Sequence, residues 1–152
     1  MKSLKCNVYN LEITPHKYKC LGVNGDKIDH FIHPDTQNSL PKLYVIKNAK
    51  TVSYVGITSQ SMSTRLRIGF KADGKTGYWG YKWKNELTNA ELYIWNFPSK
   101  DTGYVEAIEG ELVYYLREQT GKWPKHQMEI HFHPDVTKEQ SDIAKTLLKA
   151  ML

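Results

Sequence analysis

Cysteine is scarce in this 152-residue chain, and none of its segments is both long and apolar. Two cysteines, Cys6 and Cys20, are too few for a disulfide framework or a cysteine-based zinc motif. Because no run approaches the roughly 18 apolar residues of a transmembrane helix, we expect no membrane association. Residues 1–5 carry charge without an apolar stretch behind them, so no signal peptide is expected. These absences together predict a reducing, cytoplasmic location.

Acidic residues are outnumbered by basic ones, 16 against 21, which gives a formal net charge of +5 and a pI near 9.1. Internal repeats, low-complexity tracts and long linkers are also missing from the sequence. Hydrophobic residues at 40% and charged residues at 24% are typical of an ordinary globular protein. The positive charge favours polyanionic partners such as nucleic acid, although charge alone specifies neither the fold nor a reaction.

The apolar pattern predicts an α+β fold with a small, mostly antiparallel sheet flanked by helices. The predicted strands are residues 6–13, 17–23, 28–33, 42–47, 51–57, 90–97 and 128–133. The predicted helices are residues 61–71, 81–88, 103–119 and 137–151. We expect a single domain over residues 1–152, made of an N-terminal β extension (1–40), a core (42–127), and a C-terminal strand and helix (128–152).

Helix termini carry recognisable signals. Ser61 is a plausible N-cap, and Thr137 with Gln140 fits a capping box. Gly121 and Pro124 follow the helix predicted for residues 103–119, where stop signals belong.

Two tyrosines in the predicted hairpin are the first candidate site residues. If residues 48–50 form its loop, Tyr44 lies directly opposite Tyr54, with their Cβ atoms about 4.5–5.5 Å apart. Gly56 then follows on the same face and leaves the backbone open to close approach. The same tyrosine pair also fits an ordinary sheet-stabilising contact, and a one-residue change of loop length would separate the two rings.

Charged side chains on two predicted helices are the second set of candidates. Glu109 lies on the flank of the apolar stripe of helix 103–119, where a carboxylate needs a cation or hydrogen-bond donors. Its partner is either a basic side chain such as Arg65 or Arg67, or a metal ion held with water and phosphate oxygens. Arg65 lies at the edge of its helix's apolar side, where a guanidinium can bind phosphate through two hydrogen bonds. His131 and His133 fit a strand end better than a zinc site.

Taken in order, these elements resemble the GIY-YIG nucleases. Leu43-Tyr44-Val45 and Tyr54-Val55-Gly56 are similar to the two tripeptides of the family, with ten residues from tyrosine to tyrosine. The segments 63–67 and 108–113 are similar to its arginine helix and its glutamate helix. The resemblance covers about residues 42 to 127. Four elements in order at workable spacing are a stronger signal than either tripeptide alone.

The resemblance implies a metal-dependent DNA endonuclease. Glu109 would hold one Mg²⁺ or Mn²⁺ ion, and Tyr54 would act as the general base with Tyr44 close by. Arg65 would stabilise charge on the phosphate. Ile57 and Gln127 depart from residues common in the family. A non-catalytic nucleic-acid-binding module on the same fold and an RNA-cleaving nuclease therefore remain as alternatives.

The residues expected to contact nucleic acid interleave with aromatic side chains, a combination that suits phosphate contact and base stacking. They are Gly56, Arg67, Lys71, Lys75, Lys82 and Lys84. Lys71 and Lys75 are also candidates for an additional basic catalytic group. The tryptophans of the same stretch, Trp79 and Trp83, fit core positions better than stacking positions. No separate DNA-binding domain is evident, so sequence specificity is expected from the β extension, residues 70–84, a homodimer or a partner protein.

Overall fold

The computed structural model describes residues 4–14, 17–32, 36–77, 80–127 and 130–152. It confirms the α+β class. Within these residues, five strands form one sheet in the order β2-β1-β5-β3-β4, and every strand pair is antiparallel. The elements in chain order are β1 (Cys6–Thr14), β2 (Lys17–Val23), β3 (Lys42–Asn48), β4 (Thr51–Thr58), α1 (Met62–Lys71), the 3₁₀ helix η1 (Lys82–Asn85), β5 (Asn89–Asn96), α2 (Thr102–Thr120) and α3 (Lys138–Met151).

The N-terminal β extension is part of this sheet. Strand β1 pairs with the central strand β5 over seven positions, from Cys6 opposite Trp95 to Glu12 opposite Asn89. Strand β2 then forms one edge of the sheet, and β4 forms the other. The position of β4 at an edge matters for function, because groups from both faces of a sheet can meet around an edge strand.

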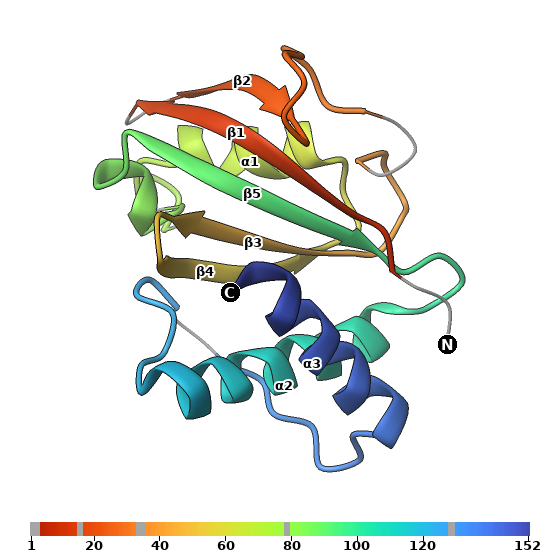
Figure 1. The fold of residues 1–152 in the computed structure, drawn as a ribbon. Helices are drawn as coiled ribbons and strands as arrows, with labels where there is room; N and C mark the ends of the chain where they lie inside the picture. Colours follow the sequence, from red (N-terminus) through yellow and green to blue (C-terminus); the bar gives the residue numbers. More distant parts are fainter. Residues whose placement is uncertain (1–3, 15–16, 33–35, 78–79, 128–129) are drawn as a thin grey trace.

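Helices and loops cover both faces of the sheet, and the side chains of β3 are buried on each face. Its side chains alternate between the faces, as a strand requires. Leu43 and Val45 pack with α2 and α3, whereas Tyr44 and Ile46 pack with α1 and the segment around η1. Figure 1 shows α1 on one side of the sheet and the α2–α3 pair on the other. Near-continuous apolar runs such as 43–46 reflect this burial on both sides.

Capping side chains fix the helix ends where the sequence predicts them. The Ser61 hydroxyl accepts a hydrogen bond from the Thr64 amide, and Thr137 with Gln140 forms the expected capping box. Gly121 ends α2 in the left-handed conformation, with φ of 78°. Among the described residues, no helix combines the length and the apolar character needed to cross a bilayer.

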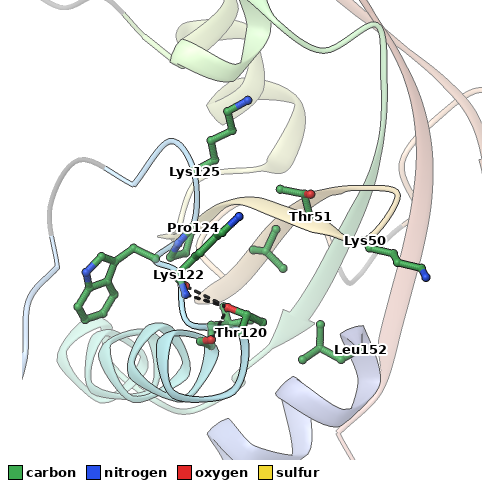
Figure 2. Close-up of a pocket in the computed structure, with 10 residues that line it drawn as sticks. Lys50, Thr51, Thr120, Lys122, Pro124, Lys125 and Leu152 are labelled. Carbon is green, nitrogen blue, oxygen red and sulfur yellow. Dashed lines mark hydrogen bonds between the residues drawn. The ribbon is translucent and has the colours of Figure 1, made fainter.

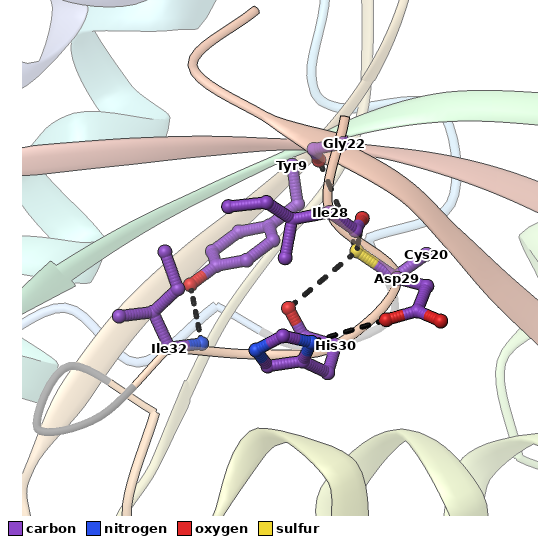
Figure 3. Close-up of polar contacts among 7 residues, drawn as sticks. All are labelled: Tyr9, Cys20, Gly22, Ile28, Asp29, His30 and Ile32. Atoms are coloured by element: carbon purple, nitrogen blue, oxygen red, sulfur yellow. Dashed lines mark hydrogen bonds and ion pairs between the residues drawn. The ribbon is translucent and has the colours of Figure 1, made fainter. Parts of the chain in front are cut away.

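The strand predicted for residues 28–33 is wrong over its described part, 28–32. This segment covers the sheet through side-chain contacts instead of a strand ladder (Figure 3). The Ile32 amide donates to the Tyr9 hydroxyl at 3.1 Å, and the Cys20 thiol donates to the Ile28 carbonyl at 3.4 Å. Periodicity cannot separate such a covering segment from a short strand.

The strand predicted for residues 128–133 is also wrong over 130–133, and residues 128–129 lie outside the described part. The chain here runs against α2. A Cβ atom added to Gly110 would lie 2.8 Å from the His131 carbonyl oxygen, so the absence of a side chain at Gly110 permits this approach. His131 is thereby carried to the edge of β4.

Candidate active site

The two hairpin tyrosines lie on one face, in a register that differs from the prediction. Tyr44 is opposite Gly56, and Tyr54 is opposite Ile46. The turn contains only two residues, and Ser53 is an extra residue in β4, so the pairing shifts by two positions. Because an even shift preserves the face, the rings still approach, with centroids 5.9 Å apart. The predicted direct pairing of Tyr44 with Tyr54 is therefore wrong.

Gly56 provides the space for these rings. A Cβ atom there would lie 2.7 Å from the Tyr44 Cζ atom and 2.7 Å from the Tyr54 Cε1 atom. Gly56 is buried beneath the tyrosines, which contradicts its predicted role as open backbone for nucleic acid.

We expect Gly56→Ala to destabilise the protein by about 1–3 kcal/mol, because the methyl group overpacks the tyrosine rings. Urea denaturation measures the change. Gly103→Ala is the matched control, since a Cβ atom there meets only an Asp101 oxygen at 3.5 Å. Equal stability of Gly56→Ala and wild type would contradict the assigned role of Gly56.

Tyr44 is fully buried and positions another tyrosine. Its hydroxyl and that of Tyr81 are 2.8 Å apart in a hydrogen bond. Burial, followed by the neighbouring Tyr81 and Tyr54, raises the pKa of Tyr44 well above its usual value. Tyr44 is thus unsuited to act as a base, and its contribution is to hold the Tyr81 ring in place.

Arg65 projects from α1 toward the same tyrosines. Its guanidinium lies 4.7 Å from the centroid of the Tyr81 ring, and the Tyr81 ring is 5.5 Å from that of Tyr54. Helix α1 approaches closely because Gly69 has no side chain: a Cβ atom there would lie 2.2 Å from Tyr81 Cε2. Tyr81 therefore links Arg65, Tyr44 and Tyr54 into one aromatic and cationic cluster.

Glu109 on α2 is 7% exposed, and no described residue donates a hydrogen bond to it or forms an ion pair with it. Burial raises the pKa of Glu109 to about 8, with the negative charge of Glu106 adding to the effect. Of the two alternatives for Glu109, the salt bridge to Arg65 or Arg67 is not formed within the described chain. A buried carboxylate in this state favours a proton or a bound cation.

A pocket of about 320 Å³ at the β4 edge brings these groups together. Tyr54 comes from one face of the sheet edge, Arg65 from α1 and Glu109 from α2. Tyr44 lies behind the pocket and does not line it. The remaining lining residues are Val55, Ile57, Gly80, Tyr81, Lys82, Glu106, His126, Gln127 and His131.

Four lining residues with polar side chains had no predicted role in this site: Tyr81, Glu106, His126 and His131. Gly110 within α2 is a sequence signal for a close backbone approach, but the sequence does not indicate that His131 is the residue that approaches it. Gln127 has a defined position here. Its side-chain amide donates to the Val55 carbonyl and accepts from the Val55 amide, both at 3.0 Å. It thus fixes its own segment to the edge of β4.

The basic residues predicted to contact nucleic acid separate into different environments. Lys82 lines the pocket, whereas Arg67 and Lys71 line another groove between α1 and the start of β2. Lys75 is exposed and pairs with Asp73 at 3.6 Å.

The prediction for Lys84 is wrong, because its side chain is buried. Its ammonium donates to the carbonyls of Gly69, Phe70 and Ala72, at 3.1, 3.1 and 2.7 Å. Lys84 therefore closes the C-terminal end of α1, where a cation complements the helix dipole. Trp83, as predicted, is a core residue, and Trp79 lies outside the described residues.

The donor set suits a metal ion that keeps most of its water. Within the described residues there is no group of three or more His, Cys, Asp or Glu side chains able to hold a metal. Mg²⁺ is commonly held by one or two carboxylates together with water and substrate phosphate. Glu109, buried and without a cationic partner in the described chain, fits that role. Glu106, the other carboxylate of the pocket, lies 2.7 Å from the His133 ring nitrogen Nε2.

In comparisons with protein-family models, with curated proteins and with solved structures, no match to this chain was found. The likeness to GIY-YIG nucleases rests on the motifs of the chain itself.

Proposed function

We propose that the pocket hydrolyses phosphodiester bonds in DNA with one Mg²⁺ or Mn²⁺ ion, in the manner of a GIY-YIG nuclease. The observation that carries the proposal is the buried Glu109 carboxylate, which faces the same 320 Å³ pocket as the Arg65 guanidinium and the Tyr54 phenol. A carboxylate can hold a metal ion, a guanidinium can stabilise charge on the phosphate, and a phenolate can act as a base, so the three groups together are able to support phosphodiester hydrolysis at a single metal ion.

Each residue has a separate task in this proposal. Arg65 binds the phosphate oxygens and offsets the charge that develops on them. Tyr54 accepts a proton from the attacking water. A phenol has an ordinary pKa near 10, so positive charge must favour its phenolate at neutral pH, and Arg65 supplies part of that charge. Glu109 would hold the metal ion, which polarises the scissile phosphate and stabilises the leaving oxygen when it is bound.

Two unpaired cysteines agree with a reducing compartment, and we include a cytoplasmic location in the proposal. In this proposal, sequence specificity comes from a homodimer, a partner protein or the surface outside the pocket.

The test is incubation of the purified protein with supercoiled plasmid DNA and, separately, with RNA, each in Mg²⁺, Mn²⁺ or EDTA. We expect nicked and linear DNA with either metal ion, no product in EDTA, and intact RNA. A mobility shift of DNA without cleavage would favour the non-catalytic binding module. Cleavage of RNA alone would make the protein an RNA nuclease.

A further inference from the structure

A second concave surface lies next to the candidate active site, between the β3–β4 turn and the C-terminal end of α2. This groove has a volume of about 530 Å³. Figure 2 shows Lys50 and Thr51 on the turn side, and Thr120, Lys122 and Lys125 on the side of α2 and the segment after it.

The groove carries positive charge that is available to a ligand. Three of its described lining residues are lysines, and none is an aspartate or glutamate. Lys125 is ion-paired with Glu86, whereas Lys50 and Lys122 form no ion pair with any described carboxylate. Two exposed ammonium groups from two different elements suit an extended polyanion.

Trp123 adds an aromatic surface to the same groove. The side chain is 42% exposed, which is uncommon for tryptophan in a folded domain. The Arg117 guanidinium lies 5.5 Å from its ring centroid, and the Phe132 ring, also exposed, lies 6.3 Å away. Arg117 donates a hydrogen bond to the Gly121 carbonyl, which orders the guanidinium that contacts the indole ring. An exposed indole beside lysines is the arrangement on which unpaired nucleobases stack.

The groove and the active-site pocket lie side by side along β4. Lys125 lines the groove and His126 lines the pocket. Their amides donate to the carbonyls of Val52 and Ser53, at 3.2 and 2.8 Å, which holds this segment on the strand edge. On β4 itself Val52 lines the groove and Val55 lines the pocket, a separation of about 10 Å along a strand. A nucleic-acid strand that leaves the pocket in the direction of the β3–β4 turn therefore enters the groove.

We propose that this groove binds an unpaired, single-stranded stretch of the nucleic-acid substrate that flanks the scissile bond. The assignment to substrate rests on the proposed nuclease function, whereas binding of single strands does not. Trp123 stacks on a base, and Lys50 and Lys122 contact phosphates on either side of it. Stacking on an indole requires an open base face, which a paired duplex does not present along its length.

The test measures equilibrium binding of a fluorescent dT12 oligonucleotide and of a 12-base-pair duplex in EDTA, so that cleavage plays no part. We expect Trp123→Ala to weaken dT12 binding at least about fivefold, the low end for loss of one base–aromatic stack. Wild type and Trp123→Ala should bind the duplex with equal affinity. Tyr114→Ala removes a similarly exposed aromatic side chain outside the groove and should match wild type.

A lysine variant provides an independent readout. For Lys50→Ala combined with Lys122→Ala, the salt slope of dT12 binding should fall by about 1.4, since each phosphate contact with a single strand contributes about 0.7. Lys27→Ala, an exposed lysine beyond the opposite edge strand, should leave the slope unchanged.

Wild-type affinity of Trp123→Ala for dT12, or an equal loss for dT12 and the duplex, would overturn the proposal. The nuclease proposal fails separately. Dependence of dT12 binding on Trp123 without any metal-dependent cleavage would leave the groove assignment standing and remove the nuclease. Metal-dependent cleavage with no effect of Trp123→Ala on dT12 binding would support the nuclease and remove the groove assignment.

Discussion

Glu109→Gln is expected to abolish metal-dependent DNA cleavage and, without metal at alkaline pH, to make the protein more stable. Glutamine keeps the shape of the side chain but is a poor ligand for a hard cation. Loss of the ion removes several kcal/mol of charge stabilisation, which corresponds to a fall in rate on the order of 10³-fold or more. Plasmid nicking in Mg²⁺ measures this effect.

The stability change follows from the raised pKa of Glu109. Its folded-state pKa is about 8, against 4.5 for the ordinary side chain. Between these values the folded protein holds a proton that the unfolded chain lacks, so the free energy of unfolding falls as the pH rises from about 4.5 to about 8. At pH 9 and without metal, Glu109→Gln should exceed wild type by a few kcal/mol. At pH 5 the two should be nearly equal.

Urea denaturation at pH 5 and pH 9 in EDTA, repeated with Mg²⁺, separates metal binding from a structural role. Mg²⁺ should stabilise wild type at pH 9 and leave Glu109→Gln unchanged, because the ion binds the ionised carboxylate. The metal-ligand assignment would be wrong if Glu109→Gln nicked DNA at the wild-type rate. It would also be wrong if Mg²⁺ stabilised both proteins equally.

Arg65→Ala is expected to lower the cleavage rate by about 10² to 10³-fold while the protein stays folded, since a donor aimed at a developing oxyanion contributes that much. Its side chain is only half-buried, and its described ring contact is a cation–π interaction, so the stability change should stay near 1 kcal/mol. Single-turnover cleavage measures the chemical step independently of product release.

Arg67→Ala is the matched control for Arg65→Ala. Arg67 lies two residues further along α1, carries the same charge and lines a different groove. It should cut at close to the wild-type rate. Arg65→Lys should recover only part of the activity, because an ammonium cannot form the paired hydrogen bonds of a guanidinium. Equal rates for Arg65→Ala and Arg67→Ala would contradict the placement of Arg65 at the reacting phosphate.

Much of the fold could be predicted from local patterns, because helix periodicity and caps are local signals. Helices α1, α2 and α3 begin and end within about a residue of the positions that Ser61, Gly121 and the Thr137 capping box indicate. Strand pairing depends on less visible features. The extra residue at Ser53 and the two-residue turn shift the hairpin register, and neither has a clear sequence signature.

Predictions for individual side chains failed where tertiary contacts decide the environment. Lys84 is one of several lysines in a basic stretch, and only the fold turns it inward to the carbonyls that end α1. Tyr81 enters the site because Gly69 admits its ring, a relation between residues twelve positions apart. Glu109, in contrast, was identifiable from its position on the flank of an apolar stripe. Its burial without a described partner is consistent with the stability–function trade-off common at active sites.

The most direct test of the central claim is the location of a Mn²⁺ ion by anomalous X-ray diffraction from crystals of the protein grown with Mn²⁺ and a DNA oligonucleotide. We predict one ion within about 2.0–2.2 Å of a Glu109 carboxylate oxygen, with a DNA phosphate bound to the same ion and to Arg65. An ion bound away from Glu109, or a phosphate on Arg65 with no ion beside it, would contradict a single-metal phosphodiesterase site in this pocket.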